Sequence, residues 1–107
     1  MATNQILANA VNTSINTPEP FFKAGLKGVV IESFTATNNS SVNASYKAYI
    51  VANAGTQKPQ IPFKVVVWGE NDLGIGIVNQ MIPPGGTLKL ECSALDSIYF
   101  TVTGREI

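Results

Sequence analysis

The segment "NQMIPPGGTLKLE", residues 79–91, combines two prolines and two glycines with a stretch in which apolar and polar residues alternate. Pro83 and Pro84 fix their own φ angles and bias the residue before each toward an extended backbone. Gly85 or Gly86 can adopt the positive φ that a tight reversal of the chain requires. These four residues therefore predict a structural turn that joins two β-strands.

Short alternating segments, separated by turn-forming residues, make up most of the chain. The predicted strands lie at residues 28–37, 44–51, 63–69, 75–81, 87–92 and 97–104, and residues 70–74 are a predicted turn. Their expected core faces carry Ala44, Tyr46, Ala48 and Ile50, then Leu88, Leu90 and Cys92, and finally Ile98, Phe100 and Val102. We therefore expect an all-β fold, a single antiparallel β-sandwich of the immunoglobulin-like or jelly-roll-like kind.

The segment "FKVVVWG", residues 63–69, is apolar on both of its predicted faces. Phe63, Val65 and Val67 share one face, whereas Val66 and Trp68 share the other. Since one face of a sandwich strand normally meets water, something has to cover the second face. Val66 and Trp68 could be covered by the N-terminal arm, by a second copy of the chain or by a different protein, and we expect a homo-oligomer.

Two segments lie outside the predicted strands. Residues 52–62 form a polar connection, in which Pro59 and Pro62 are poor residues for a central strand because proline cannot donate to the ladder. Residues 1–20 are expected to form an N-terminal arm or lead-in, either a short helix capped by Thr3 or an extended segment. The β-sandwich domain is then expected at residues 21–107.

The charge of the chain is balanced, with seven Lys and Arg against seven Asp and Glu, and charged residues make up only 13% of it. A surface without a basic field predicts neither nucleic acid nor membrane as a partner. No apolar run approaches the roughly 20 residues that span a bilayer, and the first residues lack the features of a secretory signal. We expect a soluble protein folded in a cytoplasm, with Cys92 as a small buried hydrophobe rather than a reactive thiol.

The sequence contains no histidine, which excludes Ser-His-Asp and Cys-His triads and the common zinc sites. Glu70 and Asp72 are the only carboxylates that the sequence brings together, and a solvated turn is their favoured interpretation. The glycine-rich segment 69–76 lacks the residues of a phosphate-binding or EF-hand loop. We therefore expect no enzyme, no cofactor and no metal site.

Two further patterns have both a functional and a structural interpretation. Aromatic side chains could form a platform for sugar rings, although core and sheet packing is the favoured interpretation of Trp68, Tyr46, Tyr49 and Tyr99. Asn-x-Ser/Thr triplets match glycosylation acceptors. Such residues also favour turns, and we interpret in this way the triplets that begin at Asn12, Asn38, Asn39 and Asn43.

Three segments, "VVIESFTATNNSSVNASYKAYIV", "MIPPGGTLKLE" and "TVTGREI", together resemble a family of small β-sandwich virion proteins of tailed bacteriophages. The shared pattern is an Asn-rich turn at Asn38–Ser41, a Pro-Gly-Gly-Thr corner at Pro84–Thr87, and a Gly-x-Glu-Ile end at Gly104–Ile107. The resemblance covers roughly residues 20–107, whereas residues 64–79 match no motif of the family.

The resemblance implies a non-enzymatic structural protein of a phage particle, most of all a capsid decoration or cementing protein. A neck, collar or tail accessory protein is the first alternative, and a carbohydrate-binding or adhesin module is the second. The implied partners are the major capsid protein or head–tail connector proteins, in a virion that assembles in the bacterial host cytoplasm. The candidate interface residues are Val66, Trp68, Tyr49, Arg105 and Ile107.

Overall fold

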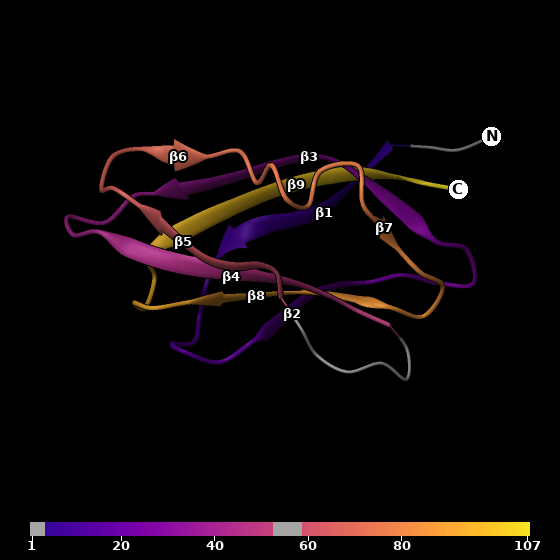
Figure 1. Ribbon diagram of the computed structural model, residues 1–107, viewed down its shortest axis with the longest axis horizontal. Coiled ribbons are helices and arrows are strands. Elements are labelled where there is room, and N and C mark those ends of the chain that lie inside the picture. The colour runs from indigo at the N-terminus through magenta and orange to yellow at the C-terminus, as the bar shows by residue number, and fades with distance from the viewer. Residues whose placement is uncertain (1–3, 53–58) are drawn as a thin grey trace.

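A computed structural model describes residues 4–52 and 59–107, and in these residues the regular structure is all β-strand, arranged in two antiparallel sheets (Figure 1). The first sheet has the order β1-β9-β3-β6, with β7 also paired to β3. Its strands are β1 (Asn4–Val11), β9 (Ile98–Glu106), β3 (Val29–Asn38), β6 (Asn71–Asp72) and β7 (Met81–Ile82). The second sheet has the order β2-β8-β4-β5. Its strands are β2 (Glu19–Lys23), β8 (Thr87–Cys92), β4 (Ala44–Val51) and β5 (Pro59–Val66).

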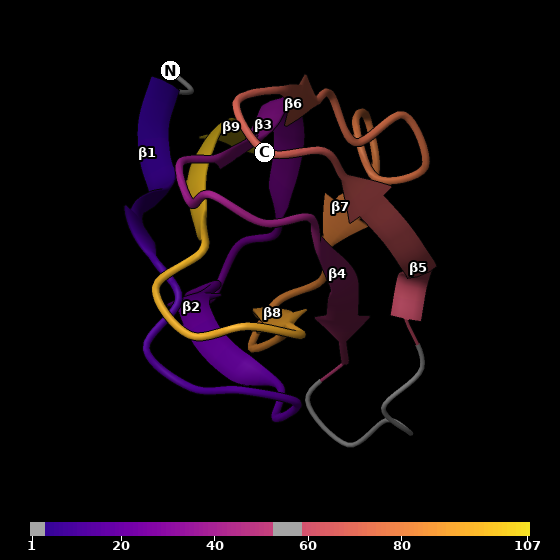
Figure 2. The same cartoon turned by 90° about the vertical axis from the view of Figure 1, so that its left-hand side faces the viewer.

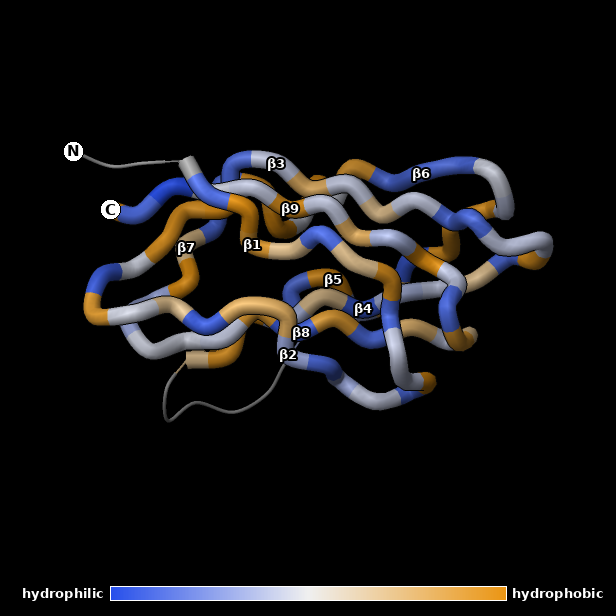
Figure 3. The backbone as a smooth tube through the Cα atoms, turned by 180° about the vertical axis from the view of Figure 1, so that it is seen from behind, coloured by the Kyte–Doolittle hydropathy of each residue, from blue (hydrophilic) through white to orange (hydrophobic). Residues whose placement is uncertain are grey.

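The two sheets pack face to face and enclose one core, so the expected antiparallel β-sandwich is confirmed (Figure 2). In β8 and most of β9, buried residues alternate with less buried ones, and the buried ones are mainly apolar. Figure 3 shows hydrophobic and hydrophilic residues following one another along the backbone of these strands. The core centres on three rings. Tyr46 lies 5.7 Å from both Phe34 and Phe100, measured between ring centroids. Aromatic contacts between the sheets thus fix how one sheet sits on the other.

Simple alternation predicted the inward faces of β4, β8 and β9 correctly. The predicted core residues of these strands are buried, apart from Ile50, which is half-buried. Cys92 is also buried, as expected.

The predicted strand at residues 75–81 is wrong except at Met81, where β7 begins. Residues 75–79 form a turn, in which the N–H groups of Ile77 and Val78 both donate to the carbonyl oxygen of Gly74. Gly74 has a φ of 59° and packs so closely on Phe34 that a Cβ atom would overlap the Phe34 ring. The predicted turn at residues 70–74 is wrong in part, because it contains β6. Ile77 fills the core from this turn rather than from a strand.

The inner and outer faces of β5 differ from those that the sequence predicted for its candidate interface residue, Val66. Val66 is buried, so it is not available to a partner, whereas Phe63 and Val65 are exposed. The register between β4 and β5 shifts once between Lys64 and Ile61, which brings both Ile61 and Val66 to the inner face although they lie five positions apart. β5 is the edge strand of its sheet, the position in which Pro59 and Pro62 are tolerated. The expected connection at residues 52–62 is wrong at residues 59–62, which belong to β5, and the strand expected at residues 63–69 ends at Val66. Residues 53–58 lie outside the described residues.

The N-terminal segment belongs to the sandwich. Residues 4–11 are extended and pair with β9, so the helical alternative is wrong for them. Leu7 and Ala8 are both buried because the register with β9 shifts between Ile6 and Ala8. Thr3, the expected helix cap, lies outside the described residues. β2 begins at Glu19 and therefore crosses the expected boundary at residue 20.

The proline-glycine corner joins β7 to β8, as predicted. Gly85 has a φ of 74°, and the N–H of Gly86 donates to the carbonyl oxygen of Pro83 at 2.8 Å. The N–H of Gly85 also donates to the carbonyl oxygen of Gly25, at 3.0 Å. The corner thus closes one end of the sandwich together with the connection from β2 to β3.

We predict that Gly85→Ala destabilises the fold by about 1–2 kcal/mol, because an L-residue is strained in the left-handed region. The melting temperature should fall by at least about 4 °C for a domain of this size. Gly25→Ala is the matched control, since a Cβ there meets nothing within 4 Å and its φ is not positive. Thermal unfolding followed by circular dichroism checks the pair, and equal melting temperatures would contradict a special role for Gly85.

Candidate functional site

The Cys92 thiol is buried, and the described acidic side chains do not gather into a metal site. In the described part of the chain, no group of three or more His, Cys, Asp or Glu could hold a metal ion. Burial, followed by the charges of Glu19 and Glu91, raises the pKa of the Cys92 thiol to about 12. The thiol therefore stays protonated at neutral pH. No helix among the described residues is long and apolar enough to cross a membrane.

The candidate aromatic platform does not form as one surface. Tyr46 lies between the sheets and Tyr49 is also buried, so neither ring is available to a sugar. The Tyr49 hydroxyl donates to Glu91 at 2.6 Å. Burial, followed by this hydrogen bond and the charge of Glu91, raises the pKa of Tyr49 to about 12. Because its side chain is buried, Tyr49 is also a poor candidate for contact with a partner.

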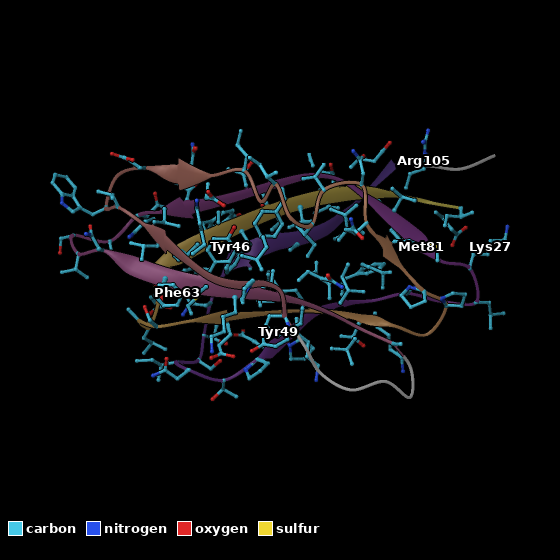
Figure 4. All side chains as sticks on the ribbon, viewed as in Figure 1. Lys27, Tyr46, Tyr49, Phe63, Met81 and Arg105 are labelled. Atoms are coloured by element: carbon cyan, nitrogen blue, oxygen red, sulfur yellow. The ribbon has the colours of Figure 1, made fainter. Side chains whose placement is uncertain are left out.

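The remaining candidate interface residues lie at opposite ends of the molecule. Arg105 pairs with Val30 near the start of β3, at the end where Lys27 and Met81 also lie (Figure 4). Its guanidinium lies 3.5 Å from the Glu32 carboxylate, and Ile107, two residues further along the chain, is exposed. Trp68 precedes Gly69, whose N–H donates to Asn38 at the other end of β3. A strand of ten residues, roughly 30 Å, separates the two groups.

Two buried asparagines hold the connections at the Trp68 end. The Asn38 amide donates to the carbonyl oxygens of Val42 and Val66, at 2.9 and 2.8 Å. The Asn12 amide donates to Ala94 and Ser14, and its side-chain oxygen accepts the N–H of Ser97. These two Asn-x-Ser/Thr triplets therefore start at residues that order turns, as the structural interpretation predicts.

A different surface, which sequence reasoning missed, lies where the two sheets meet at β3 and β5. The Tyr46 hydroxyl donates to Asp72 Oδ2 at 2.6 Å, and the Gly74 N–H donates to the same oxygen at 3.1 Å. Lys64 of β5 lies 3.6 Å from Asp72 Oδ1. Asp72 is thus bonded to β4, to β5 and to the turn that follows it, rather than placed for catalysis with Glu70.

The turn held by Asp72 presents apolar side chains to solvent. Leu73 is 61% exposed and Ile75 is 92% exposed. Beside them lies a groove of about 460 Å³, whose lining includes Phe34, Leu73, Ile75 and Val78. A second hollow of about 230 Å³ lies between Ile75 and Pro62 of β5. We call Pro62, Leu73, Ile75 and Val78 the turn surface.

The sequence carried one signal of the turn surface. The segment "DLGIGIV", residues 72–78, places two glycines among apolar residues, which weakens a strand and can indicate close approach of the backbone to another group. Gly74 makes this approach to Phe34, which lies forty residues earlier in the chain. No local pattern identifies that partner.

Comparison with known proteins gives similarity of fold. No family model and no curated protein matches the sequence. A chain in the structure of the infectious bursal disease virus Gx strain is similar, with a TM-score of 0.56, 14% identity, and coverage of 99% of this chain and 31% of that one. A chain in the crystal structure of the T13 particle of the same virus matches with a TM-score of 0.56, 11% identity, and coverage of 100% and 31%. The protein spans less than a third of either chain, and at these identities the likeness is one of fold alone.

We predict that Tyr46→Phe loosens the turn surface, because Asp72 loses its hydrogen bond from a buried donor. The loss should lower the free energy of unfolding by about 1–2 kcal/mol. Amide hydrogen exchange should also quicken at Gly74, Ile77 and Val78 more than in β8 or β9. Tyr49→Phe is the control, since it removes a hydroxyl bond to Glu91 on another part of the fold. Equal exchange at the turn in both variants would show that the Tyr46 hydroxyl does not hold it.

Proposed function

We propose that the chain is a non-enzymatic structural protein of a virus particle. The observation that carries this proposal is the fold, because the described residues form a β-sandwich similar over 99–100% of the chain to part of chains from the infectious bursal disease virus structures. A structural role agrees with a chain that has no histidine and whose buried polar side chains are engaged in holding turns. It also agrees with an exposed apolar surface rather than a polar, reactive cleft.

The finer proposal is a decoration or cementing protein of a tailed bacteriophage. It rests on the resemblance carried by the Asn-rich turn, the proline-glycine corner and the end of the chain. In the structure Asn38–Ser41 leads from one sheet to the other, Pro84–Thr87 is the corner, and Gly104 pairs with Ile31 inside the first sheet. These motifs therefore specify the fold. A neck, collar or tail accessory protein would have the same motifs, and its partners would be connector proteins rather than the major capsid protein.

A carbohydrate-binding module is the second candidate, and one observation favours it. Phe63 is 63% exposed. It lines a hollow of about 210 Å³ together with the polar side chains of Lys47, Glu91 and Ser93. An exposed ring beside hydrogen-bonding groups suits the two faces of a sugar. Binding on a glycan array that is lost in Phe63→Ala would support this function in place of the particle role.

We predict that the chain is a stoichiometric component of purified particles. Quantitative mass spectrometry of gradient-purified particles from the virus that encodes it should find the chain in many copies per particle. Recombinant chain should also bind particles assembled without it, and the amount bound should saturate. Absence of the chain from the particles, or removal by a mild salt wash without saturable rebinding, would contradict the structural role.

A further inference from the structure

We propose that the turn surface binds the same surface of a second copy of the chain around a two-fold axis. This inference deepens the proposed function, since it names one partner of a protein repeated in a particle. It can fail while the particle role holds. Its basis is the shape, the charge and the anchoring of the turn that carries Leu73 and Ile75.

The turn surface contains both a projection and a hollow. Ile75 is 92% exposed, and it forms one wall of the open groove of about 460 Å³ that Leu73, Val78 and Phe34 also line. An isoleucine side chain occupies on the order of 100 Å³ at the packing density of a protein interior, so the groove has room for one. In a two-fold interface the same patch of both copies meets, so each residue of one copy contacts the corresponding partner residue of the other. Ile75 of each copy would then enter the groove of the other.

The charges around the turn surface do not oppose this pairing. Lys64 and Asp72, which line the hollow on one side of Ile75, lie 3.6 Å apart and neutralise each other within one copy. The whole chain has a formal net charge of zero. Two copies can therefore approach without like-charge repulsion, and an apolar patch needs no charged complement.

The apolar area that the turn surface exposes indicates a weak dimer. The exposed parts of the turn surface amount to on the order of 300 Å² of apolar area in each copy, which is within the range of the largest patch on an ordinary monomer. A standard interface buries about 800 Å² on each side, so polar residues at the rim have to supply the rest. We expect a dissociation constant in the micromolar range, low enough for pairing at the local concentrations of a particle surface.

The turn is held in place before any partner binds. Asp72 accepts hydrogen bonds from Tyr46 and Gly74, and Ile77 is anchored in the core two residues after Ile75. A rigid turn loses little conformational entropy on association, which favours binding by a small apolar surface.

Sedimentation equilibrium of the recombinant chain tests the proposal. The wild type should dimerise, and Ile75→Asp should raise the dissociation constant at least about tenfold, as loss of a central contact does. Leu26→Asp is the matched control, because Leu26 is 99% exposed in another connection and should leave the constant unchanged. A wild type that stays monomeric at high micromolar concentration, or an unchanged constant in Ile75→Asp, would overturn the proposal.

A covalent test is independent of any loss of stability. Cys92 is buried, so Ile75→Cys introduces the one accessible thiol. Two such thiols near a two-fold axis should form a disulfide-linked dimer on mild oxidation, whereas Leu26→Cys should form far less. Equal yields of dimer from both variants would count against pairing through the turn surface.

Particle binding separates the two proposals. A dimer that does not join particles would refute the particle role alone, whereas a monomer that still binds saturably would refute the pairing alone. If the wild type is monomeric and Ile75→Asp abolishes particle binding, the turn surface binds a different virion protein. That outcome overturns the second-copy proposal.

Discussion

The hydrogen bond from the buried Tyr46 hydroxyl to Asp72 closes the side of the sandwich that strand pairing leaves open. The Tyr46 ring packs against Phe34 and Phe100. Its hydroxyl donates to Asp72, the last residue of β6. Burial, and then the bond to Asp72, raise the pKa of Tyr46 above its ordinary range, so the hydroxyl remains a donor. Because Asp72 also accepts the Gly74 N–H, one carboxylate sets the path of the chain from β6 to β7.

The same constraint leaves Ile75, beside Leu73, as an apolar side chain that is almost fully exposed. Once Gly74 lies on Phe34 and Ile77 is in the core, the residues between them have to face outward. Ile75 is exposed for this reason, and Leu73, which precedes Gly74, is exposed beside the groove that Phe34 helps to line. The surface that we propose for pairing is thus a consequence of how the core is closed. At the two ends of the sandwich, buried asparagines and the proline-glycine corner hold the connections between strands.

Features with a local cause could be predicted from the sequence. The corner follows from the geometry of proline and glycine, and the inward faces of β8 and β9 follow from unbroken alternation. Features that depend on tertiary contacts could not be predicted. The shift between Ile6 and Ala8 breaks the alternation of β1, and the bulge between Ile61 and Lys64 changes which residues of β5 are buried. Of the candidate interface, Val66 and Tyr49 are buried, whereas the turn surface depends on a contact with Phe34 that no local pattern encodes.

A reconstruction of the intact particle at side-chain resolution would test the central claim most directly. The claim is that this sandwich is a repeated structural unit of the particle and that its turn surface forms an interface between copies. The account predicts density for the chain at symmetry-related positions, with Ile75 of one copy in the groove beside Phe34 of its neighbour. Particles that lack the chain, or copies whose turn surface faces solvent while other surfaces make every contact, would contradict it.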